Sequence, residues 1–437
     1  MNLKQINSIV NGTIINNKKL TKINKIKIDS KKVNKNDIFI CIKGNNKDGH
    51  DYIEDVINKC SLIIVEKNIN ITTNTPIIKV ENTIIALQLL SKFIKEKYNP
   101  YTIAITGSVG KTTTKNLIYK ILKNKYNVIT NEKNYNGQIG VPLTILNLNK
   151  NIDILLVEVG ISQKNEMDRL SNIITPDMAL ITNIGSSHIG NFKTKKNILN
   201  NKLKITKYMK DGILIVNSSD KYLNKLKNKT NYYIDYINYK YFKVKNINIH
   251  LDKMEFDIYI NNKMYKIVTK LIGKHFIIDI LFAIEIGLLF DIEIDDIIKS
   301  VESYIGNEHR LNIIKNNNYT IIDDTYNSSF ESVTSLIDLT KNIKNKIYII
   351  GDIKELGVHS IKYHKKINNI LKKIKDKEVI VTGEYTKYIS GIHFNNNSEI
   401  INYLKNSDLD NKTIILKASH CLKFDEIVKY LNKIVRL

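Results

Sequence analysis

Residue types that are rare in this chain already narrow its class. The 437 residues include no tryptophan, four prolines and three cysteines, and arginine occurs only at Arg169, Arg310 and Arg436. Lysine, asparagine and isoleucine are abundant throughout, a bias that AT-rich coding produces without selection for binding. A residue type that this background disfavours is therefore the more informative one, and Arg310, Pro142 and the glycine clusters carry extra weight.

The few cysteines exclude a disulfide scaffold and a thiolate metal site. Cys41, Cys60 and Cys421 are widely separated, have no metal-ligand spacing and leave an odd thiol in any pairing, so a reducing cytoplasm fits best. The N-terminus has no apolar signal-peptide core, and no apolar run approaches the roughly 18 residues of a membrane span. We therefore expect neither export nor stable membrane insertion.

The formal net charge of +24 would ordinarily suggest a nucleic-acid partner. The excess lysine is spread along the chain, however, and no ladder of aromatic residues accompanies it. We expect no nucleic-acid partner, although a basic ATPase that binds RNA or DNA remains an alternative. A chain of 437 residues also exceeds what one hydrophobic core normally serves, so two or three domains are expected.

A glycine-containing segment between a strand and a helix is the most informative motif. The apolar run 101–105 is typical of a buried strand, residues 106–115 read TGSVGKTTTK, and a helix-forming stretch follows. Glycines let backbone N–H groups turn toward an anion, Lys111 can neutralise phosphate oxygens, and Thr112 can offer a hydroxyl to Mg²⁺. The segment predicts an ATP site formed by Thr106, Gly107, Ser108, Val109, Gly110, Lys111, Thr112 and Thr113.

This phosphate loop is shorter than the usual eight-residue form, which would need glycine where the chain has Ile105. The alternative is a chance Gly-Lys-Thr in a lysine-rich chain. The strand before the segment and the helix after it weaken that alternative. The shorter form also distinguishes this chain from the ATP-binding proteins that have the eight-residue loop.

The first part of the chain predicts a small α/β domain. Short apolar segments at 37–42 and 61–65 are joined by polar connections. A helical pattern then runs from Thr83 to Tyr98, and we expect the first domain boundary just before it. The positions expected on one face of this helix are Ile85, Ala86, Leu89 and Phe93.

From residue 101 strands alternate with helices, which predicts a parallel sheet with ligand groups at the carboxyl ends of its strands. An antiparallel ribbon with Asn261-Asn262 at one turn interrupts this order, and a long apolar helix follows it. From about 306 the α/β alternation resumes. The predicted strands are 101–105, 154–158, 178–184, 212–217, 242–250, 254–260, 263–269, 319–323, 347–351, 379–382 and 413–416, and the apolar helix is 275–290.

The sequence therefore predicts an α/β protein of three domains. Residues 1–82 form a small N-terminal domain, and residues 83–305 form a central phosphate-loop domain with a parallel sheet and an antiparallel ribbon. Residues 306–437 form a Rossmann-like C-terminal domain.

Two side chains at predicted strand ends are candidates for a metal site. Glu158 ends the run LLVE, and His188 follows a strand in NIGSSH. Both would open onto the face that holds the phosphate loop, where a carboxylate and an imidazole could complete the shell of one or two Mg²⁺ ions. The alternatives are a solvated carboxylate and a capping histidine.

Taken together, these motifs resemble the Mur ligase family of ATP-dependent amide-forming enzymes. The order is that of the family: the phosphate loop, NYNGQIGVPL at 134–143, Glu158, Thr182-Asn183, His188, Gly273-Lys274-His275 and Arg310. Three further stretches are similar to the family members that add a dipeptide: DSK at 29–31 with DGHD at 48–51, DDTYN at 323–327, and GDIKELG at 351–357 with His364. The resemblance covers nearly the whole chain.

The resemblance implies a reaction and its participants. The enzyme would add D-alanyl-D-alanine to a UDP-N-acetylmuramoyl tripeptide through an acyl phosphate, in the synthesis of peptidoglycan precursors. It would use ATP and Mg²⁺ and act as a single chain in the cytoplasm. Lys111 and Mg²⁺ would offset the repulsion between the triphosphate and the substrate carboxylate.

The resemblance also assigns roles around the nucleotide. Thr112, Glu158, His188 and Lys202 would ligate metal, with Lys202 as a carbamate formed by CO₂ on a neutral amine; the family usually has an acid where this chain has Lys204. Lys111, Glu158, His188, Lys202 and Arg310 would be the catalytic residues. Asn183 would lie near adenine, Arg310 near the phosphates and Asp324 near the ribose, and Asp279 stands where the family has an adenine-facing asparagine.

For the other substrates the resemblance implies two further groups of residues. Those for the UDP-sugar acceptor are Ser30, Lys31, Lys43, Asp48, Gly49, His50, Asn134, Tyr135 and Asn136, with Lys31 where arginine is common. Those for the incoming amine are Tyr326, Asn327, Ser329 and Glu355, with Phe330 where proline is usual. For this second group, loop and helix-capping roles are an equal alternative.

Two alternatives remain within the family resemblance. Another Mur-type ligase would add a single amino acid or glutamate to a related acceptor, although the segment 323–327 argues against it. A decayed, inactive relative would explain the departures at Lys204, Asp279 and Phe330.

Overall fold

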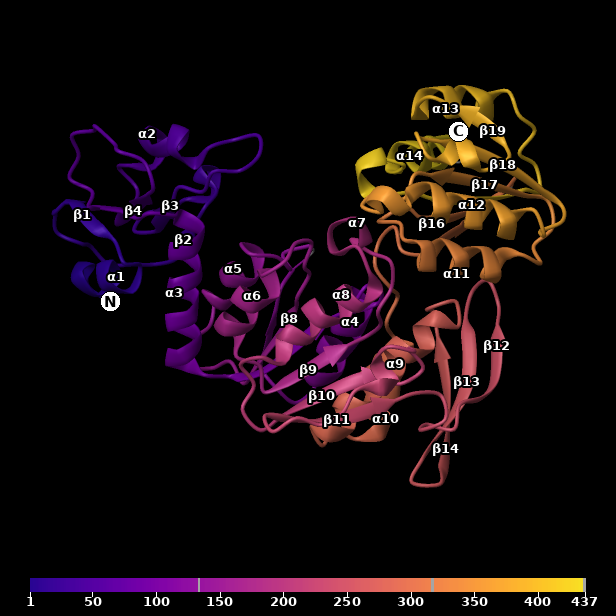
Figure 1. The fold of residues 1–437 in the computed structure, drawn as a ribbon, viewed down its shortest axis with the longest axis horizontal. Coiled ribbons are helices and arrows are strands. Elements are labelled where there is room, and N and C mark those ends of the chain that lie inside the picture. Colours follow the sequence, from indigo (N-terminus) through magenta and orange to yellow (C-terminus); the bar gives the residue numbers. More distant parts are fainter. Residues whose placement is uncertain (133, 316–317, 435–437) are drawn as a thin grey trace.

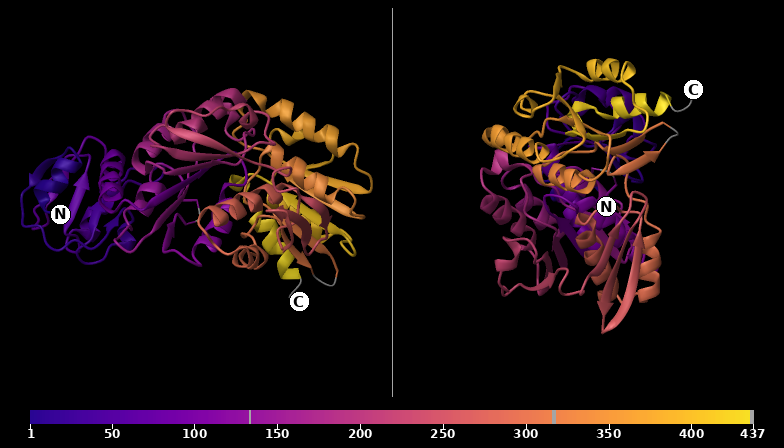
Figure 2. Two further views of the ribbon diagram at one scale, coloured as in Figure 1. Left: turned by 90° about the horizontal axis from the view of Figure 1, so that it is seen from below. Right: turned by 90° about the vertical axis from the view of Figure 1, so that its right-hand side faces the viewer.

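The structure is a computed structural model that describes residues 1–132, 134–315 and 318–434. Three α/β bodies follow one another along the molecule, with the N-terminal body at one end and the C-terminal body at the other (Figures 1 and 2). Helix α3 (Thr83–Tyr98) stands between the first body and the second. The predicted α/β fold with three domains is confirmed, while the boundaries after residues 82 and 305 stay predictions.

The N-terminal body is a five-stranded sheet with strand order β1-β5-β4-β3-β2. Strand β1 is antiparallel to β5, and the other neighbours are parallel. Apolar side chains of β3 and β4 alternate between two small cores, one on each face of the sheet. The elements are α1 (Leu3–Ile9), β1 (Thr13–Asn16), β2 (Ile26–Lys27), β3 (Ile38–Ile40), α2 (Ile53–Val56), β4 (Leu62–Val65) and β5 (Ile77–Lys79).

Helix α3 belongs to two cores. Ala86, Leu87 and Leu90 are buried with the N-terminal sheet, and the helix also packs on α5 (Gly140–Ile145) and α6 (Glu166–Ile174) of the central domain. The face predicted from the sequence was partly wrong, because Ile85 is 49% exposed while Leu87 is buried. Because α3 packs against two domains, its buried residues do not form a single apolar stripe.

The central sheet has six strands in the order β11-β10-β9-β6-β8-β7, and every neighbouring pair is parallel. Ile103 and Ile105 of β6 face the core under α4, α9 and α10, whereas Ala104 between them faces the core under α5, α6 and α8. This alternation is the period of a strand buried on both faces. The carboxyl ends of the strands therefore meet at one edge, as predicted.

The strands of the central sheet are β6 (Tyr101–Thr106), β7 (Val128–Thr130), β8 (Ile154–Glu158), β9 (Met178–Ile181), β10 (Gly212–Asn217) and β11 (Tyr232–Ile237). The helices of this domain are α4 (Lys111–Leu122), α5 (Gly140–Ile145), α6 (Glu166–Ile174), α7 (Ile189–Phe192), α8 (Lys195–Leu203), α9 (His275–Leu289) and α10 (Ile294–Glu302). Strand β9 is shorter than the predicted 178–184.

The predicted ribbon is present as β12 (Lys245–Ile249), β13 (Met254–Ile260) and β14 (Lys263–Thr269), all antiparallel. Asn261 and Asn262 both have positive φ, of 50° and 64°, as a two-residue hairpin turn requires. Strand β12 is shorter than the predicted 242–250, because Phe242 turns into the core of the central domain.

The C-terminal sheet has the order β15-β16-β20-β17-β18-β19, and only β15 is antiparallel to its neighbour. Helices α13 and α14 cover one face, and α11 and α12 cover the other. Among the described residues, no helix is both long and apolar enough to span a membrane. The elements are β15 (Asn312–Lys315), β16 (Thr320–Asp324), α11 (Phe330–Thr340), β17 (Lys346–Gly351), α12 (Ser360–Leu371), β18 (Lys377–Thr382), β19 (Ile392–Phe394), α13 (Asn397–Lys405), β20 (Thr413–Lys417) and α14 (Asp425–Ile434).

Candidate active site

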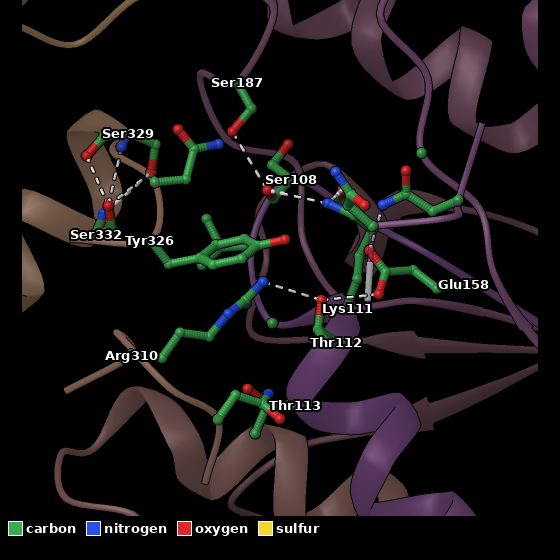
Figure 3. Close-up of a pocket in the computed structure, with 18 of the residues that line it drawn as sticks. Ser108, Lys111, Thr112, Thr113, Glu158, Ser187, Arg310, Tyr326, Ser329 and Ser332 are labelled. Atoms are coloured by element: carbon green, nitrogen blue, oxygen red, sulfur yellow. Dashed lines mark hydrogen bonds between the residues drawn. The ribbon is translucent and has the colours of Figure 1, made fainter. Parts of the chain in front are cut away.

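A cleft of about 2050 Å³ lies between the central and C-terminal domains (Figure 3). The phosphate loop forms one wall, and the segments around residues 310 and 326 form the opposite wall. Predicted site residues that line it are Gly107, Ser108, Val109, Gly110, Lys111, Thr112, Thr113, Asn134, Asn136, Glu158, Asn183, His188, Lys202, Asp279, Arg310, Asp324, Tyr326, Asn327, Ser329 and Glu355. The fold thus gathers side chains that are far apart in the sequence.

The phosphate loop has the tight turn that its glycines predicted. Gly110 precedes α4 with φ of 86°, a left-handed conformation, and a Cβ there would lie 2.4 Å from Oδ1 of Asp279. A Cβ on Gly107 would lie 1.9 Å from Oγ1 of Thr182. Backbone shape and space both require glycine at these two positions.

Asn183 holds the phosphate loop directly. Its Oδ1 accepts hydrogen bonds from the backbone N–H groups of Ser108 (3.2 Å) and Val109 (3.0 Å), and its Nδ2 donates to the carbonyl of Val109 (3.0 Å). The side chain therefore shapes the loop, and a contact with adenine stays a prediction. Thr106 ends β6 with a buried hydroxyl.

Two lysines converge on one backbone carbonyl of the loop. Nζ of Lys111 and Nζ of Lys202 donate to the oxygen of Gly107 at 3.0 and 2.8 Å. Burial is the main cause that lowers the pKa of both amines, and for Lys202 the nearby charge of Lys111 adds to it and takes the pKa well below its usual value. A neutral amine at Lys202 is the form that CO₂ can modify.

A chain of hydrogen bonds crosses the cleft from Asn136 to Arg310. Asn136 donates to Oε1 of Glu158 (2.7 Å), the hydroxyl of Thr112 donates to Oε2 of Glu158 (2.8 Å), and Nη2 of Arg310 donates to the same hydroxyl (3.1 Å; Figure 3). The guanidinium also stacks on Tyr326, 4.1 Å from the ring centroid. Arg310 of the C-terminal side therefore already reaches the phosphate loop.

The donor set at this point suits a hard cation. The Thr112 hydroxyl and the Glu158 carboxylate lie together and are oxygen ligands of the kind that Mg²⁺ prefers. Within the described part of the chain, no cluster of three His, Cys, Asp or Glu residues could hold a metal by itself. The remaining ligands of a Mg²⁺ ion here would be waters, phosphate oxygens or the other predicted metal-binding side chains.

His188 contacts the C-terminal domain. Its Nδ1 lies 2.7 Å from Oε2 of Glu355, and this close contact lowers the pKa of Glu355. Both residues have positive φ, 59° and 65°, so each occupies a strained backbone position at the interface of the two domains. A metal-binding role for His188 stays a prediction.

Two of the residues predicted to bind the amine substrate make local contacts within the C-terminal domain. Ser329 caps α11 by accepting a hydrogen bond from the N–H of Ser332 (3.2 Å), which is the helix-capping alternative. Phe330 follows as the first residue of α11 and packs on Tyr363, with ring centroids 5.0 Å apart. Asn327 accepts from the N–H of Ser328 and lines the cleft.

The predicted acceptor residues fall into two places. Tyr135 is 47% exposed beside the cleft. His50 is buried, with Nδ1 next to Asp48 (2.5 Å) and Nε2 accepting from the N–H of Glu66 (3.1 Å), so the ring fastens its loop to the end of β4. The other predicted acceptor residues belong to the N-terminal domain and do not line the cleft. They are Ser30, Lys31, Lys43, Asp48, Gly49 and His50.

Comparison with known proteins gives this arrangement a context. The Mur ligase middle-domain model matches residues 105–287, and the Mur ligase catalytic-domain model matches residues 22–102. The UDP-N-acetylmuramoyl-tripeptide–D-alanyl-D-alanine ligase of Buchnera aphidicola (subspecies Baizongia pistaciae) is 35% identical over 99% of this chain and 98% of its own length. The chain belongs to the Mur ligase family.

Other relatives agree along the whole length. The ligase of the same name from Bacillus subtilis is 30% identical, with 98% of each chain covered. A crystal structure of MurF from Acinetobacter baumannii has a TM-score of 0.90 at 24% identity, covering 99% of this chain and 98% of its own. A MurF ligase from Thermotoga maritima in complex with ADP has a TM-score of 0.84 at 24% identity, covering 94% and 98%. These two structures establish the fold.

The departure of this Mur ligase at Lys204 leaves Lys202 undisturbed. Lys204 Nζ pairs with Oδ2 of Asp168 on α6 at 2.5 Å, and Lys207 pairs with the other oxygen at 2.9 Å. Lys202 points instead to the phosphate loop. Lys204 follows the end of α8 and contacts α6, whereas Lys202 faces the loop, and a carbamate on Lys202 stays a prediction.

Asp279 lies against the phosphate loop, next to Gly110 and Thr114. Oδ1 accepts a hydrogen bond from Thr114 (3.0 Å). Burial raises the pKa of Asp279 to about 8, against the opposing effects of Thr114 and Arg310. Burial therefore favours the protonated form of the side chain at neutral pH, in which an O–H group can donate as the amide N–H of an asparagine would.

We predict that Asp279→Asn keeps most of the ligase activity at pH 7 and removes a loss of activity at high pH. In the wild type, pH above about 8 ionises Asp279 and would set an anion against the phosphate loop. Because the folded-state pKa lies above the ordinary 3.8, stability should also fall as pH rises from about 4 to about 8 in the wild type, and less so in the variant. The measurements are kcat/KM for ATP and the thermal midpoint across this range. Asp338→Asn, an exposed change, is the control; identical pH profiles for Asp279→Asn and wild type would contradict the prediction.

Sequence reasoning missed several residues of this site. Lys115, one turn after Lys111, is buried and donates to the carbonyl of Asn131, whose side chain in turn hydrogen-bonds the backbone of Glu158. Lys417 pairs with Asp324 at 2.6 Å. The spacing of Lys115 from Lys111, four residues on one helix, was a usable signal, whereas Asn131 follows a strand too short to predict.

Proposed function

We propose that this Mur ligase adds D-alanyl-D-alanine to a UDP-N-acetylmuramoyl tripeptide with hydrolysis of ATP, in peptidoglycan precursor synthesis. The observation that carries the proposal is the full-length similarity to ligases of that name, which extends over 99% of the chain at 35% identity. The cleft supports it, because the phosphate loop faces Arg310 and Tyr326 from the other domain. A cleft between two domains can bring the nucleotide and a second substrate together when the domains close.

The chemistry requires activation of the acceptor carboxylate. The terminal carboxylate of the tripeptide attacks the γ-phosphorus of ATP, the bond to the β,γ-bridging oxygen breaks, and an acyl phosphate and ADP result. The amine of the dipeptide then attacks the acyl carbon, phosphate leaves, and the amine loses a proton. Amide formation is thereby coupled to cleavage of one phosphoanhydride bond.

The residues of the cleft meet the electrostatic demand of the first step. A triphosphate and a carboxylate repel each other by an amount on the order of several kcal/mol in a closed site. Lys111 and Arg310 supply cations at the loop, and Arg310 can present two parallel N–H donors to phosphate oxygens. Glu158 and Thr112 would hold Mg²⁺, which supplies charge neutralisation at the phosphates when bound.

The remaining assignments follow from the same proposal. Asp324, held by Lys417, would meet the ribose, and a carbamate on Lys202 would be a further metal ligand. The N-terminal domain would bind the UDP end of the acceptor and would have to approach the cleft for reaction. Because ATP and UDP-linked precursors are cytoplasmic pools, we assign the reaction to the cytoplasm, with the protein as a monomer.

The direct test is an assay with defined substrates. Pure protein, ATP, Mg²⁺, UDP-N-acetylmuramoyl tripeptide and D-alanyl-D-alanine should yield one phosphate for each pentapeptide product, measured by phosphate release and mass spectrometry. Acceptors with lysine or diaminopimelate as third residue should both be tried. A panel of single amino acids as amines distinguishes the other Mur-type ligases, and the proposal fails if no acceptor gives product or if a single amino acid is preferred.

A further inference from the structure

Glu331 connects the two domains that form the cleft. It belongs to the first turn of α11 in the C-terminal domain, and its carboxylate reaches the central domain. Oε2 accepts a hydrogen bond from the hydroxyl of Ser186 at 2.7 Å, and Oε1 accepts one from Nζ of Lys195 at 2.9 Å. The side chains of Lys195 and Glu331 are only 26% and 31% exposed, so the pair is better shielded than an ordinary surface ion pair.

The Ser186 side of this contact leads to the phosphate loop. The N–H of Gly185 donates to Oγ of Ser108 at 2.8 Å, and the hydroxyl of Ser187 donates to the carbonyl of Ser108 at 3.3 Å (Figure 3). A Cβ on Gly185 would lie 3.0 Å from Cβ of Ser108 and 3.1 Å from Cδ of Glu331. The segment is therefore held closely between the loop and the carboxylate.

The Lys195 side leads to the same loop by another route. Lys195 begins α8, and the last turn of that helix carries Lys202, which donates to the carbonyl of Gly107. Apolar packing runs beside this route, since Ile189 and Phe192 of α7 share a buried core with Ile353 and Leu356 of the C-terminal domain. One carboxylate thus touches two elements that support the phosphate loop.

We infer that Glu331 is a positioning residue that fixes the C-terminal domain on the phosphate loop, so that Arg310 and Tyr326 stand opposite Lys111. The inference rests on the proposed function for its effect on ligation. Its effect on domain arrangement and on nucleotide binding is independent of that function.

The charge of Glu331 is what makes the contact specific. Burial opposes ionisation, yet Lys195 and Ser186 lower the pKa of Glu331, so it stays a carboxylate at neutral pH. Such a carboxylate accepts two charge-assisted hydrogen bonds at once, whereas an amide at this position would present one acceptor oxygen and an N–H that opposes the Lys195 ammonium. Glu331→Gln should therefore loosen the domain contact with little change of volume.

The test compares Glu331→Gln, Lys195→Met, the double variant and the charge-exchanged pair Glu331→Lys with Lys195→Glu. Matched controls are Lys196→Glu, an exposed neighbour on α8, and Asp338→Asn, an exposed position on α11. Three quantities are measured: the affinity for a fluorescent ADP analogue, the radius of gyration by small-angle scattering, and kcat with the KM of each substrate.

We expect each single variant to weaken ADP-analogue binding and lower kcat about tenfold, and to increase the radius of gyration. The double variant should be no worse than either single one, because both remove the same contact. The charge-exchanged pair should recover part of the loss, and the controls should match the wild type. In each single variant, the KM of the dipeptide should change by no more than the KM of the acceptor changes.

Three results would overturn the inference: full activity and unchanged scattering in both single variants, additive losses in the double variant, or a defect confined to the KM of the dipeptide in Glu331→Gln alone. The last would make Glu331 a ligand of the amine. If the wild type made no product but bound the ADP analogue, binding and scattering would still decide the role of Glu331 while the proposed ligase activity failed.

Discussion

Replacing Lys111 by alanine is expected to reduce ligation by about a thousandfold, the size seen when a preorganised charge at a reacting centre is removed. Lys111 is the first residue of α4, and its ammonium sits over the turn of the phosphate loop. Without it, the cation at the turn of the phosphate loop is lost, where the proposed mechanism places the transferred phosphoryl group. The measurement is phosphate release together with pentapeptide product at saturating substrates.

The same variant should fold normally. Burial already lowers the pKa of Lys111 and disfavours its charge, and its hydrogen bonds go to carbonyls of its own loop. The thermal midpoint of Lys111→Ala should therefore stay at or above that of the wild type, and Lys164→Ala, an exposed change in the same domain, should leave both activity and midpoint unchanged. Turnover that survives in Lys111→Ala would remove the phosphate loop from the mechanism.

Lys202→Met should reduce ligation by about a hundredfold or more, because a carbamate on Lys202 would be lost as a ligand and anion next to the metal. Methionine has nearly the length of lysine and can fill the same buried space, so the chemical group is removed with little change of packing. The wild type should also lose activity when CO₂ is stripped from the buffer and regain it when bicarbonate returns. The variant should respond to neither change.

The carbamate itself can be observed. Wild-type protein under ¹³CO₂ should give a carbonyl signal in the NMR spectrum that is absent from Lys202→Met, provided the sample is never acidified. Lys204→Met is the matched control, since Lys204 lies two residues away and pairs with Asp168. Equal activity in Lys202→Met and Lys204→Met would show that Lys202 serves only as a buried donor to Gly107.

Much of this fold follows from local signals in the sequence. The apolar run of β6, the glycines after it and the helix-forming residues of α4 were sufficient to locate the phosphate loop, because each obeys a short-range rule of period or backbone shape. Glu158 was expected at a strand end because the strands of a parallel sheet open on one edge, and β8 ends there.

What the sequence did not predict depends on contacts between distant segments. Strands β7 and β19 have three residues each, and their positions follow from neighbours in the sheet rather than from their own pattern. The pairing of His188 with Glu355 joins residues 167 positions apart across two domains. No periodicity along the chain encodes such a pairing.

Helix α3 has a practical consequence for dissecting the protein. Since Ala86, Leu87 and Leu90 complete the apolar interior of the first sheet, a fragment that stops at residue 82 would expose that interior to water and tend to aggregate. A fragment that continues through Tyr98 keeps helix α3, which covers this interior. Work on the N-terminal domain alone should therefore begin from residues 1–98.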